Sequence, residues 1–173
     1  MELRTLTLDH PDVRRLVAAV QQEYVNRYGG EDSTPFEPAE FAPPKGTFVV
    51  GYLDGVAVAS GGWRARAAGP EFAEGDAELK RMYVVPEARG RGLARLVLAE
   101  LERRAVAAGR RRLVLETGTR QPEAIALYLS SGYTEIPRFG VHRCEPGSRC
   151  FGKPLLPTDD TDDAGCDPAL ITR

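Results

Sequence analysis

Residues 78–95, ELKRMYVVPEARGRGLAR, indicate the fold most strongly, because they combine a strand, a turn and the start of a helix. Its first half is a short apolar run with β-branched residues near its end, which predicts a mostly buried strand. Pro86 ends that strand, because proline cannot donate a hydrogen bond to a neighbouring strand. An apolar helical stripe begins at Leu93, so a turn rich in glycine and arginine leads directly into a helix.

This turn, residues 89–92, has the properties of an anion-binding site. A helix N-terminus presents unpaired amides with partial positive charge, and glycines let a large anion approach the backbone closely. Arg89, Arg91 and Arg95 add mobile positive charge, so we expect a diphosphate site. The turn fits no Walker loop, because the chain contains neither Lys-Ser nor Lys-Thr. It also lacks a dinucleotide fingerprint, because Arg95 stands at the final glycine position.

Length and charge are those of one ordinary domain. The chain has 173 residues, enough for a single domain with a sizeable core, and a net charge of −2. This balance argues against general attraction to nucleic acid or membranes. No signal segment or membrane-spanning run is expected. The three cysteines are odd in number and lack C-x-x-C spacing, so neither disulfides nor a zinc site is indicated, and a reduced cytoplasmic setting is expected.

The remaining patterns predict strands and helices along most of the chain. Strands are expected at residues 2–8, 47–53, 56–65, 79–85, 112–116, 133–136 and 150–155, and helices at 11–28, 92–108 and 122–131. Residues 31–46 read as a long loop or short helix, and the acidic segment 158–173 as a disordered tail. Hairpin and helix connections alternate, so the fold class is α/β, with a mixed sheet and helices on both faces.

Two motifs resemble the GNAT superfamily of N-acyltransferases. R-x-x-G-x-A, from Arg89 to Ala94 behind its strand, is similar to the acyl-CoA signature of that family. Residues 124–133, AIALYLSSGY, resemble the A-x-x-L-Y-x-x-x-G-[FY] helix and strand of the family. The resemblance covers about residues 2–155. It implies a three-layer GNAT-like fold, one acyl-CoA N-acyltransferase domain at residues 1–157, acetyl-CoA as the acyl donor and no metal.

The resemblance also implies which residues bind the acyl donor. The amides of the strand at Met82, Tyr83 and Val84 would hold the pantetheine arm, and the Met82 or Tyr83 amide would polarise the acyl carbonyl. Gln121 stands where the family often has an asparagine that contacts the pantetheine arm, three residues before Ala124 of the second motif. The diphosphate would be held by Arg89, Gly90, Arg91, Gly92, Leu93, Ala94 and Arg95.

Catalytic candidates follow from the same resemblance. Tyr128 corresponds to the family tyrosine near the coenzyme sulfur, which can protonate the leaving thiolate; a core tyrosine is the alternative. Glu78, eleven positions before Arg89, is the first candidate for general base, and a strand glutamate in a salt bridge is the alternative. Glu116 is the second candidate, with a hydrogen bond to a loop amide as its alternative role. Many family enzymes use only a water chain, so a dedicated base need not exist.

The acceptor is expected to be a primary amine that attacks directly, without a covalent enzyme intermediate. Its site should lie near the first helix and the following loop, with Tyr24, Tyr28, Asp32 and Phe36 as candidates. Acidic residues of that loop favour a cationic amine only weakly: Glu31, Asp32, Glu37 and Glu40. Isolated His10 and His142 are expected to be structural or surface residues, and Trp63 a core residue or cleft wall.

Two other classes of function stay open at this point. A non-catalytic acyl-CoA-binding module or sensor would share the fold, because a fold does not guarantee transfer. The arginines between residues 103 and 112 would suit nucleic acid, but no aromatic residues interleave them and a solvated helix end explains them better. The sequence identifies neither the amine nor the acyl chain length, and a homodimer is left open.

Overall fold

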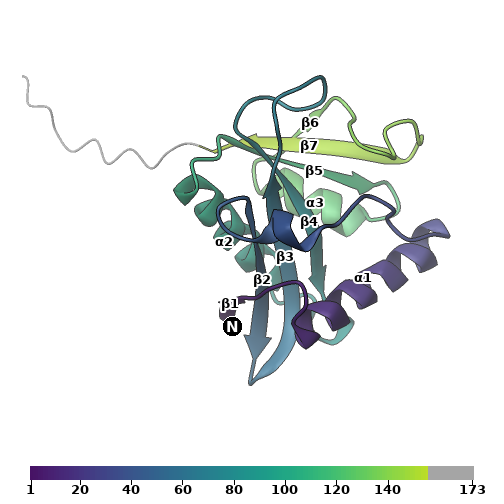
Figure 1. Cartoon of the computed structure of the whole chain (residues 1–173). Helices are drawn as coiled ribbons and strands as arrows, with labels where there is room; N and C mark the ends of the chain where they lie inside the picture. Colours follow the sequence, from purple (N-terminus) through teal and green to yellow (C-terminus); the bar gives the residue numbers. More distant parts are fainter. Residues whose placement is uncertain (156–173) are drawn as a thin grey trace, which may run out of the picture.

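A computed structural model describes residues 1–155 of the chain (Figure 1). Its strands are β1 (Glu2–Thr5), β2 (Gly46–Leu53), β3 (Val56–Ala65), β4 (Asp76–Val84), β5 (Arg112–Gly118), β6 (Thr134–Ile136) and β7 (Ser148–Pro154). Its helices are α1 (Pro11–Tyr28), α2 (Leu93–Ala107) and α3 (Pro122–Ser130), with short 3-10 helices η1 (Pro38–Phe41) and η2 (Pro86–Ala88). The expected order of elements is confirmed, and the expected tail at 158–173 lies outside the described residues.

The seven strands form one mixed sheet in the order β1-β2-β3-β4-β5-β7-β6. Only β4 and β5 pair in parallel among the described strands, because a helix connects them, whereas the other neighbours pair antiparallel. The β2–β3 hairpin turns at Asp54 and Gly55, whose φ angles of 48° and 77° suit the primed turn that an Asp-Gly pair favours. The α/β class and the mixed sheet are therefore confirmed.

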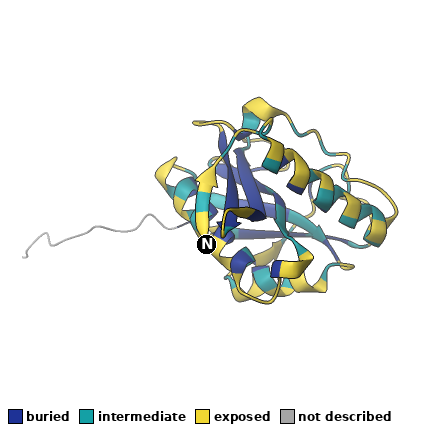
Figure 2. Ribbon diagram, turned by 90° about the horizontal axis from the view of Figure 1, so that it is seen from below, coloured by how far each residue is buried: buried dark blue, intermediate teal, exposed yellow. Residues whose placement is uncertain are grey.

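Helices cover both faces of this sheet, because alternate side chains of each strand point to opposite sides. On β2, Phe48 and Val50 pack with Val13 and Leu16 of α1, whereas Val49 packs with α2. Tyr128 of α3 belongs to the cluster on the α2 face. Figure 2 shows the buried strands between helices that each keep an exposed face. The three-layer arrangement is confirmed, and no helix within residues 1–155 is long and apolar enough to cross a membrane.

The first strand is shorter than expected. β1 stops at Thr5 instead of residue 8, although the Leu6 amide still donates to the Phe48 carbonyl at 3.1 Å. The chain turns there because the His10 amide bonds to the Thr7 carbonyl at 3.1 Å, and His10 then caps α1. This side-chain cap ends the strand earlier than the apolar pattern alone indicates.

β4 and β5 separate along their length, which opens the sheet. Their pairing covers only Asp76–Glu78 against Arg112–Val114, although β4 continues to Val84 and β5 to Gly118. A bulge beside this opening shifts the β3–β4 register, and Arg81 has a left-handed φ of 58°. Gly61 lies opposite the bulge, where an added Cβ would come within 2.5 Å of the Met82 sulfur. The register shift between Ser60 and Gly62 therefore places a β-bulge at this glycine.

Candidate active site

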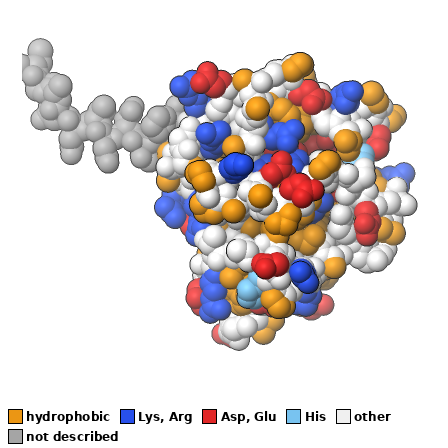
Figure 3. All heavy atoms as spheres, in the orientation of Figure 1, with side chains coloured by type: hydrophobic (Ala, Val, Ile, Leu, Met, Phe, Trp, Pro, Cys, Tyr) orange, Lys and Arg blue, Asp and Glu red, His pale blue; other side chains and the backbone are white. Residues whose placement is uncertain are grey.

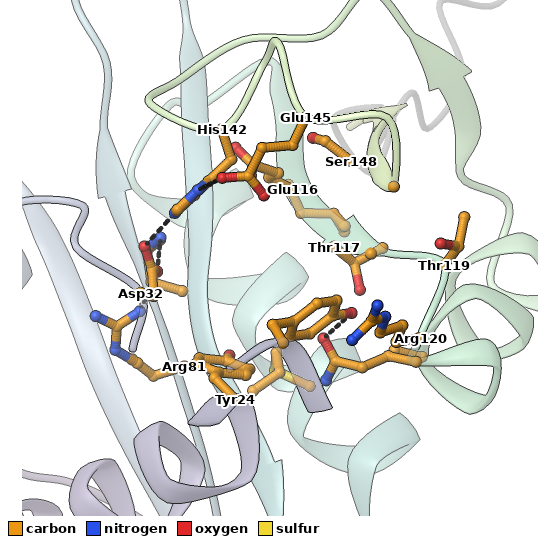
Figure 4. Close-up of a pocket in the computed structure, with 18 of the residues that line it drawn as sticks. Tyr24, Asp32, Arg81, Glu116, Thr117, Thr119, Arg120, His142, Glu145 and Ser148 are labelled. Carbon is orange, nitrogen blue, oxygen red and sulfur yellow. Dashed lines mark hydrogen bonds and ion pairs between the residues drawn. The ribbon is translucent and has the colours of Figure 1, made fainter. Parts of the chain in front are cut away.

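Two adjoining cavities occupy the opening between β4 and β5. The larger has a volume of about 580 Å³ and is walled by the end of α1, the loop after it, the β5–α3 turn and the loop before β7 (Figure 4). The smaller, about 320 Å³, runs from the end of β4 to the start of α2. Four residues line both cavities: Met82, Gln121, Ala124 and Tyr128. A ligand can therefore extend from the start of α2 into the larger cavity.

Most of the residues expected to bind the acyl donor lie around these cavities. Beyond Glu78, the edge of β4 that faces β5 makes no strand pairing within the described residues, so its backbone polar groups face the cleft. The smaller cavity is lined by Met82, Tyr83, Val84, Arg89, Gly90, Gly92, Leu93, Ala94, Arg95, Gln121 and Ala124. Arg91 is exposed and lines neither cavity.

The turn before α2 presents bare backbone to the smaller cavity. Gly90 and Gly92 have φ angles of 73° and 74°, a left-handed conformation that glycine adopts without strain. A Cβ at either position would meet no atom within 4 Å, so the space beside them is open. Gly92 is the N-cap of α2, and no side chain bonds to the first amides of that helix. This geometry suits a large anion such as a diphosphate.

Two arginines flank the turn. The Arg89 Nε donates to the Val84 carbonyl at 2.9 Å, and its Nη2 pairs with Glu23 of α1 at 3.0 Å. Arg95 donates to the Ser130 and Ser131 hydroxyls at 2.8 and 3.0 Å. Neither guanidinium is buried, so both can exchange these partners for phosphate oxygens.

Basic side chains elsewhere are mostly in local pairs. Arg103 and Arg104 pair with Glu100 at 2.8 and 2.7 Å, and Arg112 pairs with Asp76 at 2.6 Å. On the face shown in Figure 3, basic and acidic side chains are interspersed over the described residues rather than gathered into one basic patch. These pairs agree with a solvated, ion-paired surface.

Tyr128 projects from α3 between the two cavities. Its ring packs edge-on against Tyr133, with 5.6 Å between the ring centroids, and its hydroxyl makes no hydrogen bond to any other described residue. Burial raises the pKa of the Tyr128 phenol above its ordinary value of 10.0. The phenol therefore stays protonated at neutral pH, as a proton donor must.

Glu78 lies in the paired part of β4, outside both cavities. Its carboxylate accepts a hydrogen bond from Arg64 at 3.0 Å and lies 3.7 Å from Arg66 and 4.0 Å from Lys80. Both Glu78 and Arg64 are almost completely buried. This is the salt bridge that was the alternative to a catalytic role.

Glu116 lies on β5 and lines the larger cavity. Unlike Glu78, its carboxylate forms no ion pair with another described residue. Burial raises the pKa of this carboxyl from 4.5 to about 7, although the positive charges of His142 and Lys80 act in the opposite direction. A carboxylate with a pKa near neutral can both accept and release a proton at working pH.

His142 lines the larger cavity and forms ion pairs there, and the expected structural role of His10 is confirmed. His142 lies in the loop before β7 and lines the larger cavity, with Nδ1 2.7 Å from Glu145 and Nε2 3.4 Å from Asp32. Sequence spacing could not reveal this site, because Asp32 follows α1 and is 110 positions away. His10 is structural, since its Nδ1 accepts from the Asp12 amide at 3.1 Å.

Asp32 joins several elements at the edge of the larger cavity. It pairs with Lys80 at 2.7 Å and also with Arg81, both from β4. Burial would raise the pKa of this carboxyl, but Lys80, the Thr34 hydrogen bonds and Arg81 outweigh burial and hold it well below its ordinary value. Asp32 thus fixes the loop after α1 onto the bulged strand.

The other acceptor candidates divide between cavity and core. Tyr24 and Tyr28 line the larger cavity, and the Tyr28 hydroxyl donates to the Gln121 side chain at 3.2 Å. Phe36 lines neither cavity, because it packs against Phe41 with 4.5 Å between the ring centroids. Trp63 is a core residue, with 2% of its surface exposed. Residues 1–155 contain no cluster of His, Cys, Asp or Glu arranged to hold a metal ion.

Comparisons with known proteins agree with this geometry. A model of the acetyltransferase (GNAT) family matches residues 13–133. An IAA acetyltransferase of Azospirillum brasilense is 33% identical over 83% of this chain and 90% of its own length. The uncharacterized N-acetyltransferase YjgM of Escherichia coli K12 is 32% identical over 78% of this chain and 82% of its own length.

Solved structures show the same fold. A Klebsiella pneumoniae protein assigned to the acyl-CoA N-acyltransferases superposes with a TM-score of 0.73 and 28% identity, over 90% of this chain and 97% of its own. The PaiA N-acetyltransferase of Thermoplasma acidophilum, in complex with coenzyme A, has a TM-score of 0.64 at 14% identity, over 89% of this chain and 99% of its own. The chain therefore belongs to the acetyltransferase (GNAT) family.

Proposed function

We propose that this protein is an acetyl-CoA-dependent N-acetyltransferase that acetylates a primary amine by direct attack. The observation that carries this proposal is the pair of adjoining cavities that extend from the bare N-terminus of α2 to Glu116 and have Tyr128 in their shared wall. The names of relatives with 33% and 32% identity, both acetyltransferases, support it. So does the coenzyme A complex of the Thermoplasma acidophilum protein, whose fold this chain shares.

The residues around the groove fit an acyl-coenzyme A. Its diphosphate would accept hydrogen bonds from the open turn at Gly90 and Gly92, and Arg89 would exchange Glu23 for a phosphate oxygen. The unpaired edge of β4 would bind the pantetheine arm, which is a chain of amides. The bound thioester supplies the activated acyl group, and the backbone amide of Met82 or Tyr83 would stabilise negative charge on its carbonyl oxygen.

Proton transfer would be divided between two side chains. The attacking nitrogen releases one proton as the amide forms, and a lysine-like amine, which has a pKa of ~10.4 and is protonated at neutral pH, must first lose another before it can attack. Glu116 would accept that proton, directly or through water. Tyr128 would donate its hydroxyl proton to the departing thiolate, and no covalent enzyme intermediate is needed.

Glu116 is a better general base than Glu78 on three observations. Glu116 lines the larger cavity, whereas Glu78 lines neither cavity. Glu116 has no charged partner among the described residues, whereas Arg64 holds Glu78 at 3.0 Å. The pKa of Glu116 is raised to about 7, which suits proton transfer at neutral pH. We therefore assign Glu78 the role of anchoring Arg64.

The deciding experiment combines binding with turnover. Acetyl-CoA and free coenzyme A should each raise the melting temperature, by the equivalent of ~2.7 kcal/mol at a hundredfold excess over the dissociation constant, and ATP should not. Release of coenzyme thiol is then measured with a panel of amines and with IAA, the compound named for the Azospirillum relative. Binding without thiol release for every acceptor would indicate a non-catalytic acyl-CoA sensor instead. Absence of any coenzyme A binding would overturn the proposal.

A further inference from the structure

Most charged side chains that line the larger cavity are already paired. Asp32 pairs with both Lys80 and Arg81, and His142 pairs with Glu145 at 2.7 Å. A cation entering the cavity therefore finds Asp32 and Glu145 engaged by positive groups of the protein itself. Recognition of a polyamine needs several free carboxylates, and this cavity wall does not provide them.

Three charged residues of the cavity wall form no ion pair within residues 1–155: Glu31, Glu116 and Arg120. Glu31 is exposed on the loop after α1, whereas Glu116 is half-buried and carries the raised pKa already described. Arg120 lies in the turn between β5 and α3, and its Nη1 donates one hydrogen bond, to the Arg27 carbonyl at 2.7 Å. A guanidinium has five N–H donors, so most of those of Arg120 are available to a ligand.

Glu116 and Arg120 occupy different sides of the cavity. In Figure 4 the Glu116 side chain lies beside His142 and Glu145, and the Arg120 side chain lies beyond Thr117, near the end of the β5–α3 turn. The chain between residues 116 and 120 can span at most about ~14 Å. Both residues line the same cavity, so a molecule that extends across it from β5 to the β5–α3 turn can contact both charges.

We infer that the acceptor carries a carboxylate as well as its amine, as an amino acid does. This inference rests on the proposed function, because it places the reacting amine at Glu116. Arg120 would then bind the acceptor carboxylate, in the bidentate geometry that a guanidinium and a carboxylate favour. Tyr24 and Tyr28, with Leu79 and Leu115, offer an apolar wall for the rest of the molecule.

Pairs of amines that differ only in the carboxylate test this inference. Phenylalanine is compared with phenethylamine, and leucine with 3-methylbutylamine, by thiol release with acetyl-CoA. The amino acid should have the higher kcat/KM in each pair, by about ~10-fold or more, because a charge-assisted hydrogen-bonded pair is lost without the carboxylate. A pH series removes the contribution of the different amine pKa values.

Arg120→Gln should remove this preference by lowering kcat/KM for the amino acids while leaving their decarboxylated analogues nearly unchanged. Arg120→Lys keeps the charge and a donor for the Arg27 carbonyl, so it should retain part of the preference. Arg143→Gln is the matched control, because Arg143 lies in the loop before β7, is exposed and lines neither cavity. This variant should behave as the wild type.

The possible results distinguish failure of the carboxylate inference from failure of the proposed N-acetyltransferase function. Equal turnover within the pairs, unaffected by Arg120→Gln, overturns the inference and leaves the N-acetyltransferase proposal standing. If no amine releases thiol, the transferase proposal fails, and calorimetric binding of the same pairs in the presence of coenzyme A decides the inference. An Arg120-dependent preference for the amino acid in that titration supports a carboxylate site, and equal binding refutes it.

Discussion

Replacing Glu116 by glutamine should make the protein more stable and less active, and the gain in stability should depend on pH. Burial raises the pKa of this carboxyl from 4.5 to about 7. Each pKa unit corresponds to ~1.4 kcal/mol, so ionised Glu116 lowers the free energy of unfolding by up to ~3 kcal/mol. Solvent in the open cavity screens part of this effect, so we expect about ~1–3 kcal/mol.

The sign of the pH dependence follows from the two protonation states. Below pH 4.5 the Glu116 carboxyl is protonated in both the folded and the unfolded chain. Its raised pKa then does not change the free energy of unfolding, and the glutamine variant gains no stability from this source. As pH rises from 4.5 to about 7, the unfolded chain releases the proton first, and the stability of the folded wild type falls relative to the variant. The difference in unfolding free energy should therefore grow across this range and stay level above it.

Urea unfolding at several pH values measures this difference. Trp63 is the single tryptophan of the chain and is buried, so its fluorescence reports the loss of the core. Glu78→Gln is the matched control, because it removes the carboxylate that pairs with buried Arg64. This variant should therefore be less stable than the wild type at neutral pH, by ~1–3 kcal/mol. A Glu116→Gln variant that is no more stable than the wild type at pH 8, or whose gain is the same at pH 4 and pH 8, would refute this reasoning.

Other predictions concern the acid, the phosphate turn and Asp32. Tyr128→Phe should lower kcat by about ~10²-fold in the thiol-release assay, whereas Tyr133→Phe, which alters a tyrosine outside both cavities, should not. Gly92→Ala should weaken calorimetric binding of coenzyme A several-fold, because its φ of 74° disfavours a side chain although nothing blocks one. Asp32→Asn should destabilise the protein at pH 7, because the pKa of this carboxyl is lowered in the folded chain. The wild type loses that stabilisation as pH falls below 3.8, so the variant should lose less stability over the same range in acid unfolding monitored by circular dichroism.

The parts of the fold that sequence predicts well are the local ones. The strand ending at Pro86, the glycine turn and the stripe starting at Leu93 lie within a few residues of each other, so periodicity and turn chemistry determine them. The hairpin at Asp54 and Gly55 is a local signal of the same kind. The positions of these elements agree with the structure to within three residues.

Contacts between distant segments could not be predicted in this way. The choice between Glu78 and Glu116 depends on Arg64, which lies opposite Glu78 across the β3–β4 pair. A bulge in that pair shifts the register, so the spacing along the chain does not reveal which side chains meet. His142 belongs to an irregular loop, where no periodicity indicates the direction of a side chain.

The separation of β4 and β5 explains why two carboxylates on one face of the sheet have different roles. Glu78 stands opposite Val114 in the last paired position of the two strands, and Glu116 lies two residues beyond Val114 on the same side. Before the strands part, a buried carboxylate can meet cations from neighbouring strands, as Glu78 meets Arg64. Beyond that point β5 faces the cavity, so Glu116 is half-buried without a charged partner among the described residues and its pKa rises. The opening proposed to admit the acyl donor thus also creates the chemical environment of the proposed base.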